Sequence, residues 1–168
     1  STQLAGLGGT TKHIRNIAKI AKYYPISDKW VASIRGELGY IVGLGQDIHV
    51  LKRFNLGQNA IRGFANRGIG PRDSITKDAL GGEWMYSSSL QLKFPLGLPD
   101  SFPIGGRAFT DIASIGKIEP TPANVFDETS PRVAAGIGLT YNSPFGPMGI
   151  DAAIPILKED HDITENLH

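Results

Sequence analysis

Residues 29–40 alternate between apolar and polar side chains. The even positions form an apolar face that begins at Trp30 and ends at Tyr40, whereas the odd positions include Arg35 and Glu37. Successive side chains of a strand point to opposite faces, so this pattern predicts a strand with one apolar and one charged face. Trp30 and Tyr40 would lie about 33 Å apart along an extended strand, which rises roughly 25 Å when tilted by about 40°. That height matches the apolar band of an outer-membrane barrel, whereas strands average about 5–6 residues in soluble proteins.

The same alternation recurs farther along the chain. Residues 83–94 repeat it, with an aromatic residue near each end of the apolar row. The weaker segment 106–115 places Arg107 and Asp111 on the same face. Two more alternating segments are 132–142 and 148–156. We therefore predict an all-β chain of antiparallel strands.

The connections between these strands differ in length. Outer-membrane barrels have short turns on the periplasmic side and longer loops outside, and the order seen here broadly fits that rule. The shorter connections are 25–28, 95–105 and 143–147, and the longer or more polar ones are 41–81, 117–131 and 157–162.

Residues 12–24 fit two structures equally well. Ile14, Ile17, Ala21 and Tyr24 share one face of a helix, with lysines opposite. The same residues also fit a strand. The short turn before the next strand favours the strand.

Composition excludes several classes of site. The chain has no cysteine, which removes disulfides, thiolate metal sites and cysteine nucleophiles. Its net charge is +1, so no global field calls for nucleic acid. No apolar run approaches the roughly 18 residues of a spanning helix. We expect no cofactor, no metal site and no enzyme activity, and we interpret residues 160–162 and all four histidines as solvated loop or strand-end residues. These are His13, His49, His161 and His168.

The connection 41–81 contains the segment Ile61, Arg62, Gly63 and Phe64. A loop of this length without a strand pattern is usually functional or disordered. Its apolar residues leave two alternatives open: an ordered external loop stabilised by turns, or a loop folded back into a polar lumen.

The lumen alternative makes a demand on Arg62. Burying its guanidinium without a carboxylate partner would cost several kcal/mol. The polar strand faces offer Asp111, with Gln91 on a neighbouring strand.

Several motifs occur together and in order along nearly the whole chain. They are Ile61-Arg62-Gly63-Phe64, Gly68-Ile69-Gly70-Pro71, Gly81-Gly82, Ser89-Leu90-Gln91, Phe94-Pro95-Leu96, Phe109-Thr110-Asp111, Ala135-Gly136-Ile137-Gly138, and Ser143-Pro144-Phe145-Gly146-Pro147 followed by Asp151 and Pro155. With these motifs, the chain resembles the BamA family of outer-membrane-protein assembly factors.

The resemblance implies a place and a role for the loop motif. In that family the arginine of the motif sits inside the barrel and contacts acidic residues of neighbouring strands. By resemblance Arg62 is that arginine and Asp111 is its acidic partner. The family often has a glutamate where this chain has Gln91, which leaves one fewer charge for Arg62. A hydrogen bond to the Gln91 carbonyl would partly compensate.

The resemblance also implies the organisation of the whole chain. Residues 1–168 would form about the last seven to eight strands of a sixteen-strand transmembrane barrel, without the N-terminal POTRA domains and the first strands. The family folds and inserts β-barrel proteins into the bacterial outer membrane, without ATP or covalent chemistry. The implied partners are nascent outer-membrane proteins, accessory assembly lipoproteins and outer-membrane lipid, with no nucleic acid.

Two other functions remain open from the sequence. A two-partner secretion transporter also carries an Arg-Gly-Phe-type loop. A soluble all-β binding domain would show alternating strands as well.

Overall fold

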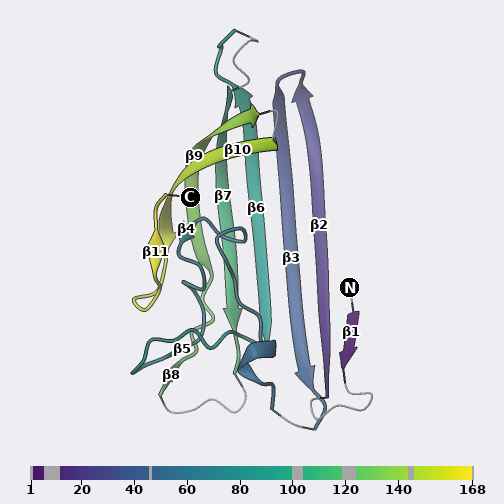
Figure 1. Ribbon diagram of the computed structural model, residues 1–168, viewed down its shortest axis with the longest axis vertical. Coiled ribbons are helices and arrows are strands. Elements are labelled where there is room, and N and C mark those ends of the chain that lie inside the picture. Colours follow the sequence, from purple (N-terminus) through teal and green to yellow (C-terminus); the bar gives the residue numbers. More distant parts are fainter. Residues whose placement is uncertain are drawn as a thin grey trace.

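The computed structural model describes residues 2–5, 12–45, 47–99, 104–118, 124–143 and 146–167. These residues form a seven-stranded antiparallel sheet in the order β1-β2-β3-β6-β7-β9-β10 (Figure 1). The strands of this sheet are β1 (Thr2–Ala5), β2 (His13–Ser27), β3 (Trp30–Gly43), β6 (Trp84–Pro95), β7 (Ile104–Gly116), β9 (Arg132–Ser143) and β10 (Gly146–Leu157). The shorter elements are η1 (Val50–Lys52), β4 (Gly63–Phe64), β5 (Arg72–Asp73), β8 (Val125–Phe126) and β11 (Thr164–Glu165).

Every strand predicted from alternation is confirmed. The ambiguous segment 12–24 is strand β2, which pairs with β3 through a short turn. The strand predicted at 29–40 runs on to Gly43 as β3, so the long connection spans residues 44–83 rather than 41–81. The turn predicted at 143–147 includes residues 144 and 145, which lie outside the described residues.

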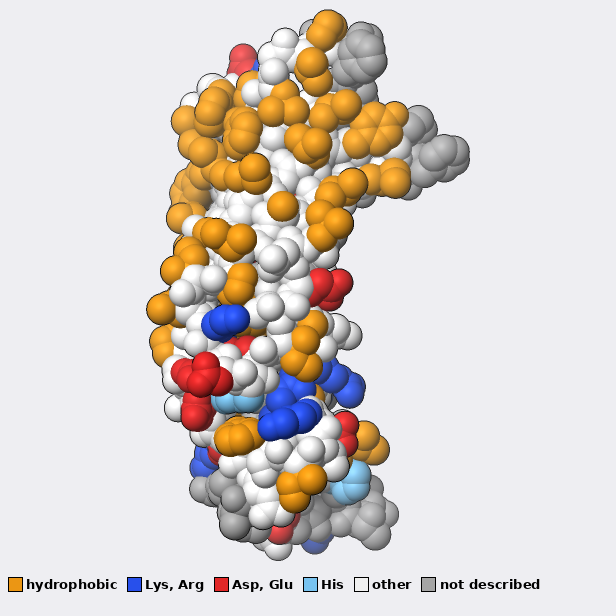
Figure 2. Space-filling model, turned by 90° about the vertical axis from the view of Figure 1, so that its left-hand side faces the viewer, with side chains coloured by type: hydrophobic (Ala, Val, Ile, Leu, Met, Phe, Trp, Pro, Cys, Tyr) orange, Lys and Arg blue, Asp and Glu red, His pale blue; other side chains and the backbone are white. Residues whose placement is uncertain are grey.

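The outer face of the sheet is apolar and exposed. Its side chains come from the even positions of β3 and β6 and from the matching positions of their neighbours. In Figure 2 hydrophobic side chains cover much of the upper part of the molecule, and charged groups gather lower down. The row includes Ile20, Ile34, Leu38, Leu90, Ile137, Leu139, Met148, Ile150, Ile154 and Ile156. Contact with lipid tails stabilises an apolar face of this kind. In water, the same face would expose a large apolar area at a cost in free energy.

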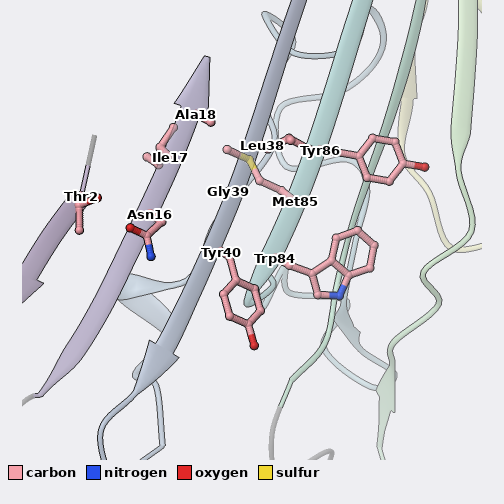
Figure 3. Close-up of a pocket in the computed structure, with 10 residues that line it drawn as sticks. All are labelled: Thr2, Asn16, Ile17, Ala18, Leu38, Gly39, Tyr40, Trp84, Met85 and Tyr86. Atoms are coloured by element: carbon pink, nitrogen blue, oxygen red, sulfur yellow. The ribbon is translucent and has the colours of Figure 1, made fainter. Parts of the chain in front are cut away.

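Aromatic residues bound this apolar face at both ends. Toward the short turns, the rings of Trp30 and Phe94 lie 5.6 Å apart. Toward the long loops, Trp84 stacks on Tyr86 at 6.0 Å beside Tyr40. Figure 3 shows these three side chains along a groove of about 520 Å³ on the outer face. Such girdles mark the two interfaces of a membrane. No helix within the described residues is long and apolar enough to cross a membrane.

The inner face carries a core that the long connection supplies. Residues 44–83 fold back across the sheet and bury apolar side chains against β3, β6, β7 and β9 (Figure 1). Of the two alternatives left open by the sequence, the inward loop is the one observed. The core cluster contains Ile41, Ile48, Phe54, Leu56, Ile61, Phe64, Ile69, Met85, Ala113, Ile115 and Ala134.

Three of the histidine and loop interpretations need correction. His13 lies at a strand end, as expected, but it is buried rather than solvated, and the His161 side chain is only 8% exposed. The interpretation of residues 160–162 as a solvated loop is wrong, because the Asp162 side chain is fully buried in an ion pair. His49 is exposed, as expected, and His168 lies outside the described residues.

Candidate functional site

The register of the sheet gathers polar side chains on its inner face. Ser89 of β6 lies directly opposite Asp111 of β7. Gln91 follows Ser89 on the same face of β6, since side chains two residues apart share a face. Asp151 reaches the same region from β10. These groups form a polar patch on the inner wall, next to the apolar core that the loop covers.

Arg62 enters this patch from the loop. Its Nε donates to Asp111 Oδ2 at 2.7 Å and its Nη2 donates to Asp111 Oδ1 at 2.8 Å, which makes a bidentate pair. The backbone N–H of Arg62 also donates to Asp111 Oδ2, at 3.1 Å. Bidentate arginine–carboxylate pairs are among the stronger hydrogen-bonded contacts in proteins.

The remaining donors of Arg62 reach three other side chains. Nη1 donates to Gln91 Oε1 at 3.1 Å and to Asp151 Oδ2 at 3.2 Å. Nη2 also donates to Ser89 Oγ, at 3.0 Å. A guanidinium has five N–H donors, and each is accounted for by one of these acceptors or by Asp111. The loop is therefore bonded to β6, β7 and β10 through one side chain.

Charge in the cluster is balanced. Asp151 also accepts a hydrogen bond from Arg107 Nε, at 2.5 Å, so two arginines face two carboxylates. The face of the Phe109 ring lies under the guanidinium of Arg62, with 3.3 Å from Arg62 Cζ to the ring centroid. An aromatic face attracts a cation at this distance. Asp151 supplies the negative charge that Gln91 lacks.

Glycines let the loop and the charged groups come this close. Gly63 has φ +88°, a conformation that L side chains rarely adopt, and a Cβ there would lie 3.2 Å from Ala134 Cβ. On the wall itself, a Cβ on Gly138 would overlap Asp151 Oδ1, and one on Gly149 would lie 2.7 Å from Arg107 Nη2. Gly63 therefore places the backbone beside the charge in a conformation, and at a distance from Ala134, that favour glycine.

The structure brings together the residues singled out in the sequence. Ile61 and Phe64 flank Arg62 and Gly63 in the core, and Arg62 contacts both Asp111 and Gln91. Sequence reasoning did not assign Asp151, Arg107, Ser89 or Phe109 to the cluster. Asp151 had a signal, since it is the one charged residue in the strand predicted at 148–156.

The chemistry of the cluster is that of a clamp. Every donor of Arg62 is engaged by a neighbouring acceptor, and the described groups hold no His, Asp and Glu cluster of metal-ligand size. The clamp fixes the loop to the barrel wall.

The sheet has an apolar outer face suited to lipid, aromatic girdles at both ends and a polar inner face covered by the inward loop. These features define the wall of an outer-membrane β-barrel. Residues 1–168 match the model of the Omp85 superfamily domain. The chain belongs to the Omp85 superfamily.

Individual relatives agree with this assignment. The chain is 34% identical over 162 residues to the outer membrane protein assembly factor BamA of Neorickettsia risticii, covering 95% of this chain and 22% of that protein. It is 28% identical over 137 residues to a SAM50-like protein of Schizosaccharomyces pombe, covering 78% of this chain and 28% of that protein. The chain thus spans about a quarter of the length of these relatives.

A solved structure agrees as well. The crystal structure of BamA from Haemophilus ducreyi lacking POTRA domains 1–3 superposes with a TM-score of 0.85 at 26% identity, over 98% of this chain and 35% of that one. These matches confirm the family resemblance inferred from the motifs and the bacterial outer-membrane location that it implied.

Proposed function

We propose that this chain is part of a factor that folds β-barrel proteins and inserts them into the bacterial outer membrane. The observation that carries the proposal is the clamp of Arg62 on Asp111 and Asp151, within a chain whose relatives include outer membrane protein assembly factors. The proposed activity uses no covalent step and no cofactor.

The physical basis of the activity is the edge of a sheet. Residues 166–167 already begin to pair along β10, at Ala152 and Ala153, so the edge proposed for client pairing is the opened seam between the first and last strands of the complete barrel. Unpaired backbone groups at such an edge are a template for another strand. An incoming strand of an unfolded barrel protein would pair there by β-augmentation.

The clamp supports the strands that lead towards this seam. β4 of the loop contacts both β9 and β10. Arg62 links the same loop to β6 and β7, so movement of β9 and β10 is coupled to the interior wall. We infer that the loop sets the shape of the barrel near the strand that receives the client.

The proposed partners follow from these surfaces. Nascent outer-membrane proteins would engage the strand edge, and outer-membrane lipid would cover the apolar outer face. Accessory assembly lipoproteins are proposed on the family resemblance.

The test reconstitutes the full-length protein in lipid vesicles and supplies an unfolded outer-membrane barrel as the client. Folding of the client is followed by its heat-modifiable electrophoretic mobility. We expect faster folding than in protein-free vesicles, and a rate lowered by about tenfold or more in Arg62→Ala, since breaking a buried ion pair costs about 3–5 kcal/mol. Lys19→Ala is the matched control. It also breaks an ion pair, with Glu37, but the Lys19 side chain is exposed rather than buried. Equal client folding with and without the protein would reject the proposed function.

A further inference from the structure

A second buried arginine lies at the long-loop end of the sheet. Arg132, the first residue of β9, has a fully buried side chain, and so has its partner Asp162. Arg132 Nε donates to Asp162 Oδ2 at 3.0 Å and Arg132 Nη2 donates to Asp162 Oδ1 at 3.2 Å. Arg132 Nη1 donates to the carbonyl oxygens of Glu128 and Ser130, at 3.0 and 2.7 Å. An ion pair this deep is stable only when its remaining polar atoms are bonded, as they are here.

Three connections meet at this pair. Asp162 Oδ2 also accepts the backbone N–H of Glu159, which closes the turn after β10. His161 stacks on Phe126 of β8, with ring centroids 5.3 Å apart. Phe126 is in turn the register partner of Arg72 of β5, which belongs to the inward loop. The pair therefore lies where the connections 44–83, 117–131 and 158–163 converge.

The residues after Asp162 run between the inward loop and the sheet edge. Ile163 exchanges backbone hydrogen bonds with the loop, donating to Gly68 O and accepting from Ala65 N, both at 2.9 Å. Thr164 and Glu165 form β11 and pair with β4.

The chain then passes at once to the sheet. Asn166 O accepts the N–H of Ala153 at 2.9 Å, and Leu167 bridges Ala152 of β10. Within the five residues 163–167, the chain therefore changes its partner from the inward loop to the edge of the sheet. Asp162, held by Arg132, directly precedes this segment. A slip of one residue in such a pairing would turn each side chain to the opposite face.

We propose that Arg132 and Asp162 are a positioning pair that fixes the register of residues 163–167 between β4 and the edge of β10. The pair couples the inward loop to the last strands of the described sheet. A link from these strands to the seam that would receive a client strand rests on the proposed function, whereas the register itself does not.

The experiment reads the register directly in the full-length protein. Cysteines at Ala152 and Leu167 report the native register, and cysteines at Ala152 and Glu165 report a slip of two residues on the same face. We expect the native pair alone to cross-link in the parent protein. In Asp162→Ala and in Arg132→Ala the native cross-link should fall by about tenfold or more, because the remaining partner is a buried unpaired charge.

Two further variants separate positioning from general stability. Asp162→Asn keeps the shape of the side chain and part of its hydrogen bonding, so it should fold and give an intermediate loss of the native cross-link. Lys158→Ala, exposed on the same connection, should leave the native cross-link unchanged. Heat-modifiable mobility of each variant shows that its barrel is folded.

The cross-links decide the inference independently of client insertion. An undiminished native cross-link in folded Asp162→Ala and Arg132→Ala overturns the positioning role. Loss of barrel folding in every variant of the pair, Asp162→Asn included, also overturns it, since the pair would then act on the whole barrel. A shifted register with unimpaired client folding upholds the pair and detaches it from the proposed function.

Discussion

Arg62 and Arg132 are both buried, and each donates two hydrogen bonds to the two oxygens of one carboxylate. They connect different parts of the molecule. Arg62 is on a loop, and its partners are on strands β6, β7 and β10. Arg132 is on a strand, and its carboxylate partner Asp162 is on a loop. Arg62 and its strand partners fix a loop to the sheet, and we call them the wall cluster. Arg132 and Asp162 fix loops to one another at the long-loop end of the sheet, and we call them the rim pair.

The two clusters also differ in how many carboxylates share the charge. Arg62 is bonded to Asp111 and Asp151, so the loss of one leaves the other. Arg132 has Asp162 as its carboxylate partner, and its other contacts are with backbone carbonyls and the His161 ring nitrogen. We infer that the wall cluster loses stability in steps as its carboxylates are removed one at a time. The rim pair loses its ion pair with the removal of Asp162 alone.

The largest effect tests the stepwise loss in the wall cluster. Asp111→Ala removes three hydrogen bonds from Arg62 and should destabilise the barrel by about 3–5 kcal/mol. Asp151→Ala removes one bond from Arg62 and one from Arg107, and should cost less, about 1–3 kcal/mol. Urea unfolding of the full-length protein in detergent measures both. Equal losses, or a larger loss for Asp151→Ala, would contradict the stepwise description.

A smaller effect concerns the glycine that lets the loop approach the wall. Gly63→Ala should cost about 2–3 kcal/mol, because it adds backbone strain at φ +88° and a 3.2 Å contact with Ala134. Gly97→Ala is the matched control. Its φ is +73° and a Cβ there meets nothing within 4 Å, so it carries the backbone strain alone, about 1–2 kcal/mol.

The same variant also separates the two clusters. Gly63→Ala should raise amide hydrogen exchange in residues 61–65 while exchange at Ser130 and Arg132 stays unchanged. A parallel rise at both places would show that the two clusters open together. Equal unfolding free energies for Gly63→Ala and Gly97→Ala would remove the steric part of the argument.

The sequence predicted the strands because alternation is a local property of an extended chain. It missed the end of β3, since inner Ile41 is covered by the inward loop and is as apolar as its outer neighbour Val42. Apolar and polar residues stop alternating wherever the inner face is buried under the loop, because both faces of the strand are then apolar. A strand with a buried inner face therefore looks shorter in the sequence than it is.

The wall cluster was partly predictable for the same local reason. Parity along a strand places Ser89, Gln91, Asp111 and Asp151 on polar faces, but it does not give the register between strands. The register decides which of these side chains meet Arg62. The rim pair was not predictable. Asp162 follows an exposed acidic residue and a histidine, as in a solvated loop, and its partner lies 30 residues earlier.

The smallest effect distinguishes the rim from the wall by its response to pH. In the external loops, a hydrogen bond to Glu159 raises the pKa of Glu128. The pKa of Glu159 is lowered, chiefly by a hydrogen bond with Ser130 and then by the one with Glu128. The contribution of Glu128 is therefore present in acid and is lost as pH rises through its raised pKa, whereas that of Glu159 is lost as pH falls through its lowered pKa. The contact is best when the two carboxyl groups share one proton, between these two pKa values.

Glu128→Gln should remove this dependence, because an amide donates to the Glu159 carboxylate whether or not a proton is available. We expect amide exchange at residues 128–130, corrected for its intrinsic pH dependence, to be constant in the variant from about pH 4 to about pH 7. In the parent protein, protection should decline as pH rises over that range. Asp160→Asn, exposed on the same connection as Glu159, should keep the profile of the parent. A Glu128→Gln profile that still declines with pH would show that the response does not come from this carboxyl pair.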